Sequence, residues 1–166
     1  MLVIRDISEA DYDDLLRINA EGRPGVAALE KGVLVSLLSL PGCHLVAAAE
    51  DGTLLGYLIG FPCDADYDGE EFQHFRRILS IPFYYVDQIA VSERHRGRGV
   101  ARELYSVLFN LGRSLGMRLT CCGVNTVPPN PVSLKFHRKL GFDQMDERPV
   151  SYGCTVAFLT KWHGQE

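Results

Sequence analysis

The chain has 166 residues and a formal net charge of -4, and this length suits one compact domain with a real core. The acidic balance argues against a nucleic-acid surface, which needs a basic stripe, and no apolar run approaches the roughly 20 residues of a membrane span. We therefore expect a single domain over residues 1–166 that binds neither nucleic acid nor a membrane.

The N-terminal residues and the cysteines bear on the cellular compartment. Met1–Asp6 contains no basic segment followed by an apolar one, so we expect no secretory signal and a cytoplasmic location. None of the five cysteines forms a Cys-x-x-Cys pair, so zinc and thioredoxin-like sites lack their ligands. Buried, reduced thiols are the expected state.

Short strand patterns alternate with helical patterns along the chain, which predicts an α/β (α+β) layer fold. Ser8 and Asp11 have the spacing of a capping box, and Asp51-Gly52 is typical of a tight hairpin turn. In chain order we expect a strand over 2–5, a helix after Ser8, a helix over 26–40, a hairpin over 44–61, a short helix near 73–79, a strand over 83–91, a helix over 100–115, a strand over 118–125, a helix over 131–140, and an antiparallel pair over 142–147 and 151–161.

The most informative segment joins the strand that ends at Val91 to the helix that begins at Val100. The first turn of a helix carries free backbone N–H groups and a partial positive charge. Gly99 stands where a capping side chain is usual, so these donors remain available, and Gly97 lets the backbone approach an anion closely. Positive charge comes from Arg94, Arg96 and Arg98. The segment therefore predicts a pyrophosphate site.

Other phosphate-binding loops fail on spacing. A Walker A loop needs Gly-Lys-Ser/Thr after its glycines, and none is present. A dinucleotide fingerprint needs a third glycine where this chain has Arg102, and an acidic residue where the next strand ends at Asn125. A solvated basic loop without a ligand remains the alternative.

A second polar group follows the next strand. Asn130 is a good helix N-cap and Pro131 a good first helical residue. Ser133 and His137 are four residues apart, so they share one helix face. Asn125, at the end of its strand, can direct its amide toward a ligand between two strands.

At these two segments the sequence resembles the GNAT superfamily of acyl-CoA N-acyltransferases. Arg96–Ala101 matches that family's Arg/Gln-x-x-Gly-x-Gly/Ala pyrophosphate loop. The downstream residues match in order and at familiar spacing, and the expected element order fits nearly the whole chain; these residues are Asn125, Asn130, Ser133, His137 and Gly141-Phe142.

The resemblance implies a mixed, twisted sheet of about seven strands with helices on both faces. It also implies direct acyl transfer from CoA to an amine, with CoA between splayed fourth and fifth strands. Backbone groups of Ile89, Ala90 and Val91 would hold the pantetheine and polarise the thioester carbonyl. The remaining CoA contacts would come from Arg96, Gly97, Arg98, Gly99, Val100, Ala101, Arg102, Asn125, Asn130, Ser133 and His137.

His137 stands where the family often carries the tyrosine that protonates the leaving thiolate. A histidine can supply a proton near neutral pH, so we expect His137 to act as the catalytic acid. The alternative is a structural histidine that hydrogen-bonds CoA or fills a helix face.

Asp87 lies in an otherwise apolar strand, where an acid needs a partner or a purpose. Strand alternation predicts Tyr85, Asp87, Ile89 and Val91 on one face, and Tyr84, Val86, Gln88 and Ala90 on the other. Many relatives place a base or an amine-binding group at the Asp87 position, so we expect Asp87 to receive a proton or anchor a cationic substrate, with Tyr85 in the pocket. A buried ion pair with an arginine is the alternative.

The acidic segment Asp64–Glu71 begins like a calcium loop, but its twelfth position is Phe75 instead of the required glutamate. We expect no metal, and a solvated loop or a substrate gate instead.

These residues favour acetyl transfer from acetyl-CoA to a primary amine of a small molecule or peptide, and a homodimer is compatible with this activity. A non-catalytic acyl-CoA-binding or sensor domain is the alternative, followed by a protein-interaction module without a ligand.

Overall fold

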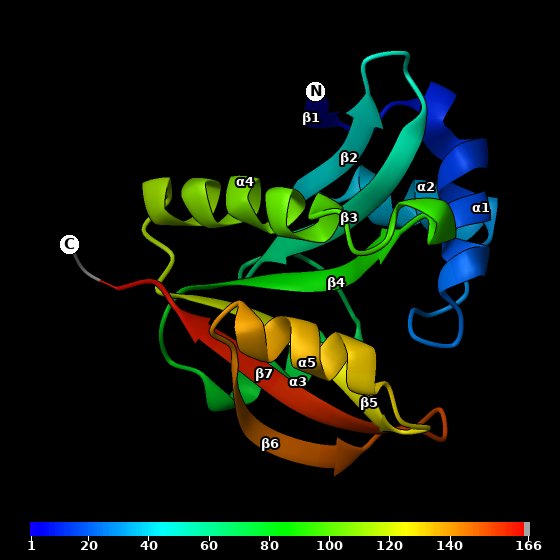
Figure 1. Cartoon of the computed structure of the whole chain (residues 1–166). Helices are drawn as coiled ribbons and strands as arrows, with labels where there is room; N and C mark the ends of the chain where they lie inside the picture. Colours follow the sequence, from blue (N-terminus) through cyan, green and yellow to red (C-terminus); the bar gives the residue numbers. More distant parts are fainter. Residues whose placement is uncertain (165–166) are drawn as a thin grey trace.

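The computed structural model describes residues 1–164. Within them seven strands form one sheet in the order β1-β2-β3-β4-β5-β7-β6 (Figure 1). Neighbouring strands are antiparallel except β4 and β5, which are parallel. The strands are β1 (Leu2–Asp6), β2 (Cys43–Ala49), β3 (Leu54–Pro62), β4 (Phe83–Val91), β5 (Leu119–Val127), β6 (Asp143–Pro149) and β7 (Thr155–Trp162).

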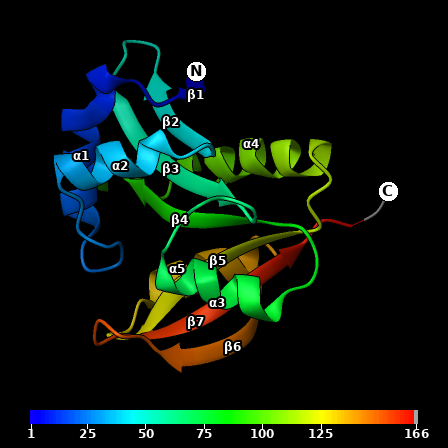
Figure 2. The same cartoon turned by 180° about the vertical axis from the view of Figure 1, so that it is seen from behind.

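Helices cover both faces of this sheet, as Figures 1 and 2 show from opposite sides. Buried side chains of the first three helices form one core with Tyr57 and Phe158, and those of α4 form a second core with Leu58 and Leu159. The mixed seven-stranded sheet expected from the sequence is confirmed. The helices are α1 (Tyr12–Gly22), α2 (Lys31–Ser39), α3 (Glu70–Ile78), α4 (Val100–Ser114) and α5 (Pro131–Lys139), with single 3-10 turns η1 (Glu9–Asp11) and η2 (Glu93–His95).

The helix predicted over 26–40 is wrong in its first five residues, because α2 begins only at Lys31. Side chains of the core satisfy the backbone of the preceding segment. Asn19 donates to the Ala27 carbonyl oxygen over 2.9 Å and accepts from the Leu29 N–H over 3.0 Å. These bonds replace those of a helix, so the segment Arg23–Glu30 stays an ordered loop.

The strict alternation predicted for β4 is also wrong beyond Asp87. Tyr85 and Ala90 both pack into the core beneath α1, α2 and α3, although they are five residues apart. The pairing of β3 with β4 shifts register between Ile59 and Gly60, opposite this point. An irregularity of this kind inserts an extra residue and turns the following side chains to the other face. Ile89 and Val91 consequently pack on the α4 side.

Two further features concern the helices and the cysteines. None of the helices in residues 1–164 combines the length and apolar character required to cross a bilayer. All five cysteines are free thiols; Cys43, Cys121 and Cys122 are buried as expected, whereas Cys63 and Cys154 are only partly buried.

Candidate active site

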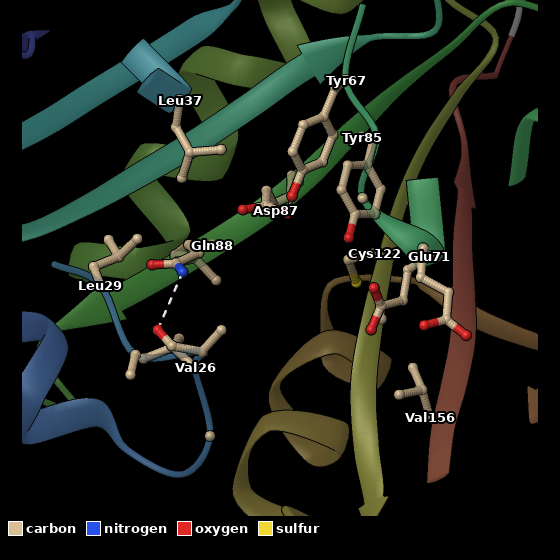
Figure 3. Close-up of a pocket in the computed structure, with 18 of the residues that line it drawn as sticks. Val26, Leu29, Leu37, Tyr67, Glu71, Tyr85, Asp87, Gln88, Cys122 and Val156 are labelled. Atoms are coloured by element: carbon tan, nitrogen blue, oxygen red, sulfur yellow. Dashed lines mark hydrogen bonds between the residues drawn. The ribbon is translucent and has the colours of Figure 1, made fainter. Parts of the chain in front are cut away.

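A cavity of about 940 Å³ opens where β4 and β5 separate (Figure 3). These strands pair only over Phe83–Val86 and Leu119–Cys122, although each continues for five residues beyond this ladder. The lining includes Tyr85 from one core and Tyr105 from the other, so the cavity reaches both faces of the sheet. Its size is that of a small-molecule site.

The start of α4 is built to receive an anion. Gly97 and Gly99 have φ angles of 74° and 83°, a left-handed backbone that favours glycine. Among the described residues no side chain caps this helix. A Cβ added at either glycine would meet no atom within 4 Å, so the space before the free N–H groups is open. This turn fits the pyrophosphate predicted for it.

The arginines of this turn differ in their contacts. The Arg96 guanidinium donates to the carbonyl oxygens of Val91 and Glu21 over 3.2 and 3.0 Å. It therefore ties the turn to β4 and α1 instead of standing free for a phosphate. Arg94 and Arg98 are exposed. The Glu21 carboxylate accepts from the Glu93 N–H over 2.7 Å and completes this attachment, which sequence reasoning missed.

Asp87 lies on the cavity at the irregular point of β4. One carboxylate oxygen accepts a hydrogen bond of 2.7 Å from the Tyr67 hydroxyl. Burial, helped by the nearby Glu71 charge and opposed by the Tyr67 hydrogen bond, raises the pKa of Asp87 to about 6. Within residues 1–164 Asp87 forms no ion pair, so the structure does not support the predicted alternative of an arginine partner.

Tyr85, predicted to line the pocket, does so with its hydroxyl directed into the cavity (Figure 3). The residue is only 4% exposed. Burial, with the charges of Asp87 and Glu71, raises the pKa of Tyr85 well above its usual value, so it remains a hydroxyl. No group in the described part of the chain forms a hydrogen bond with this hydroxyl.

His137 also lines the cavity, but its ring is only 2% exposed and both of its nitrogens are engaged. Nδ1 lies 2.8 Å from the Ser133 carbonyl oxygen and must donate to it. Nε2 lies 2.8 Å from the Tyr105 hydroxyl and is left to accept. Burial lowers the pKa of His137, which favours this neutral form. Sequence reasoning missed Tyr105, because a tyrosine on the apolar face of α4 is typical of core packing.

Two of the remaining predicted residues line the cavity, and a third holds them in position. Asn125 and Ser133 line the cavity. The Asn130 side chain caps α5 by accepting from the Ser133 N–H over 3.3 Å, as predicted from its position before Pro131. Its backbone N–H donates to the Asn125 carbonyl oxygen over 3.1 Å. Asn130 thus positions the two lining residues.

The opposite wall of the cavity is the loop Arg23–Glu30 together with α2. Gln88, the neighbour of Asp87, donates to the Ala27 carbonyl oxygen over 3.2 Å, the bond drawn in Figure 3. Gln88 also accepts from Tyr57 and Asn19, over 2.8 and 3.2 Å. Asn19 is the polar member of a mostly apolar helix stripe that also contains Tyr12, Leu15 and Leu16. That polar position is the sequence signal from which the network could have been found.

The acidic segment before β4 forms α3 from Glu70 onward, earlier than predicted, and its carboxylates edge the cavity. In the part of the chain that the structure describes, no group of three or more His, Cys, Asp or Glu side chains could hold a metal ion.

Comparison with known proteins identifies a family that this chain matches over most of its length. The Acetyltransferase (GNAT) family matches residues 6–142. The sequence has no match among curated proteins.

Solved structures share the fold over almost the full length of the chain. Ard1 from Thermoplasma volcanium is 19% identical, with a TM-score of 0.78 and coverage of 99% of each chain. The ribosomal-protein-alanine N-acetyltransferase of Brucella melitensis is 23% identical, with a TM-score of 0.70 and coverage of 97% of this chain and 99% of that one. The putative acetyltransferase yncA of Salmonella typhimurium, solved with acetyl-CoA, is 20% identical, with a TM-score of 0.70 and coverage of 100% of this chain and 96% of that one. The chain belongs to the acetyltransferase (GNAT) family.

Proposed function

We propose that this protein transfers an acetyl group from acetyl-CoA directly to the primary amine of a small molecule or peptide. The observation that carries the proposal is the course of β4. This strand bears Asp87 on the cavity, loses its partner β5 there, and leads into the uncapped start of α4. One element thus connects an amine-binding carboxylate with an anion-binding turn.

Acetyl-CoA would supply the acetyl group as a thioester. Backbone N–H groups from Gly97 to Arg102 hold its pyrophosphate, while Asn125 and Ser133 contact it from the β5 side. The backbone of Ile89, Ala90 and Val91 faces the gap left by β5 and orients the thioester carbonyl.

The reaction needs two proton transfers, one from the attacking amine and one to the leaving sulfur. The nitrogen forms its bond to the acetyl carbon as the carbon–sulfur bond breaks, and Asp87 receives the proton that the amine loses, directly or through water. Since His137 has no free N–H, its role as acid requires Tyr105. In its neutral form His137 only accepts from Tyr105, so the relay begins when solvent protonates Nε2. Tyr105 then gives its hydroxyl proton to the leaving sulfur and takes the Nε2 proton, which returns His137 to its neutral form.

The proposal includes one domain over residues 1–166 and a cytoplasmic location. The continuous sheet from β1 to β7 and the five free thiols support these two points. The Brucella melitensis enzyme acts on the alanine of a ribosomal protein, which supports an amine acceptor. A homodimer is compatible with the proposal.

Release of the CoA thiol from acetyl-CoA, measured across a panel of primary amines and peptides, tests this function. We expect amine-dependent release together with a CoA-dependent rise in melting temperature. A thermal shift without turnover on any amine would identify an acyl-CoA-binding or sensor domain instead. The absence of both would overturn the proposal.

Asp87→Asn should remove the acidic limb of the pH profile. A base with a pKa of about 6 is ionised above that pH, so wild-type kcat/KM should rise as pH increases through 6 and then level off. We expect the variant to lose about a hundredfold in kcat/KM above pH 7 and to keep its CoA affinity. An unchanged pH profile would remove Asp87 from the reaction.

The same substitution should stabilise the protein at alkaline pH. The folded-state pKa of Asp87 is raised above the unfolded value, so its stability contribution is present below pH 4 and lost as pH rises through 6. Two pKa units correspond to about 2–3 kcal/mol. Asp87→Asn should therefore raise the melting temperature at pH 8 but not at pH 4, a result opposite to that for a broken ion pair.

A further inference from the structure

Most of the charged side chains that line the cavity are acidic. Five carboxylates line it, those of Asp66, Asp68, Glu70, Glu71 and Asp87, while Arg23 is the single Lys or Arg among the described lining residues. One carboxylate would suffice to bind and deprotonate one amine. Three of the five carboxylates are exposed to solvent, and Glu70 among them already accepts from Ser151. Glu71 is the partly buried carboxylate besides Asp87, and a second positive group on the ligand would balance its charge.

Two of these carboxylates lie on opposite sides of the opening between β4 and β5. Asp87 belongs to β4, whereas Glu71 of α3 packs over Gly123 of β5. A Cβ at Gly123 would lie in ordinary contact, 3.4 Å, with the Glu71 Cγ, which places the Glu71 side chain directly over this glycine. Tyr85 lies between the two carboxylates in Figure 3.

The hydroxyl of Tyr85 independently indicates a ligand between them. The Tyr85 residue is only 4% exposed, and its hydroxyl opens into the cavity with no partner in the described chain. The polar group of so buried a side chain normally has a hydrogen-bond partner. Tyrosine hydroxyls hold both carboxylates in place, since Tyr67 donates to Asp87 and Tyr152 donates to Glu71.

We propose that the acceptor carries a second cationic group, which binds at Glu71 and the Tyr85 hydroxyl while the amine to be acetylated lies at Asp87. This inference rests on the proposed acetyl transfer and adds its substrate class. The ligand chemistry is that of a flexible dication, either a free diamine or a peptide whose second residue is lysine. Glu71 is then the specificity-determining residue.

Matched acceptors test the inference in the wild-type protein. We compare 1,4-diaminobutane with 1-aminobutane, and a peptide with lysine in second position with the same peptide carrying norleucine. At least tenfold higher kcat/KM is expected for the dication of one pair, and the pair with the larger ratio identifies the source. Equal kcat/KM within both pairs overturns the inference and leaves acetyl transfer intact.

Glu71→Gln keeps the side-chain size and an acceptor for Tyr152 but removes the charge. We expect the preference for the dication to fall to within about twofold, through a higher KM for the dication and not for its neutral-tailed partner. Asp64→Asn is the matched control, because Asp64 lies in the same acidic segment outside the cavity lining. Persistence of the preference in Glu71→Gln overturns the assignment of Glu71.

Binding without turnover separates this inference from the proposed function. The melting temperature should rise with 1,4-diaminobutane but not with 1-aminobutane, and the rise should disappear in Glu71→Gln. This result would stand even if no acceptor were acetylated. Equal shifts with both amines would overturn the dication site whatever the outcome of the activity assay.

Discussion

Gly99→Asp should abolish CoA binding while leaving the protein folded. An aspartate at this position would cap α4 with its own carboxylate and occupy the open space before the free N–H groups. Its charge would also repel a pyrophosphate. We expect at least a hundredfold loss in CoA affinity, about 3 kcal/mol, measured by calorimetry.

Gly116→Asp is the control for backbone strain. Gly116 lies just beyond the other end of α4, has a φ angle of 75°, and also has no atom within 4 Å of an added Cβ. A substitution there therefore carries the same conformational cost, at the opposite end of α4 from Gly97 and Gly99. The control should bind CoA normally. A Gly99→Asp protein that is folded and binds CoA within threefold of wild type would show that the pyrophosphate lies elsewhere.

His137→Phe should lower kcat by about a hundredfold, the usual scale for the loss of one general acid. The phenyl ring keeps the bulk of the side chain but removes the Nε2 partner of Tyr105 and the Nδ1 bond to Ser133. CoA affinity should change little. His137→Tyr should restore part of the rate, because members of the family often carry tyrosine there. The measurement is kcat under conditions where chemistry limits the rate.

Tyr105→Phe distinguishes a proton relay from a structural pair. It removes the other half of the same hydrogen bond, so in a relay both single variants and the double variant should lose similar factors. A purely structural pair would lower the melting temperature in the same three variants while kcat stayed at the wild-type value. The thiolate proton would then come from water or from Ser133.

The anion turn and the capping residues were predictable because their physics is local. Gly97 and Gly99 lie between a strong strand and an amphipathic helix, and a short stretch of sequence contains every determinant of that turn. Asn130 before Pro131 is equally self-contained, and the structure shows the cap. The order of such local patterns predicted an α/β layer fold, and the family resemblance implied the mixed sheet with helices on both faces.

The rest of the site depends on contacts that no sequence window contains. Asn19, which belongs to α1, binds the backbone of the loop Arg23–Glu30 and so prevents a helix there. The register shift beside Asp87 arises from the pairing of β4 with β3. Tyr105 meets His137 from a helix 32 residues earlier in the chain. Periodicity alone predicts a longer helix, a regular strand and a core tyrosine at these positions.

Because the ladder between β4 and β5 is short, the two halves of the sheet should open separately. The four residue pairs there are the direct strand pairing between the β1–β4 half of the sheet and the β5–β7 half. Backbone amides in the two halves should therefore exchange with solvent as separate cooperative units. A ligand lying between the strands would bind both halves and couple their opening. Slowed deuterium uptake across β5 and β7, far from the anion turn, would record that coupling.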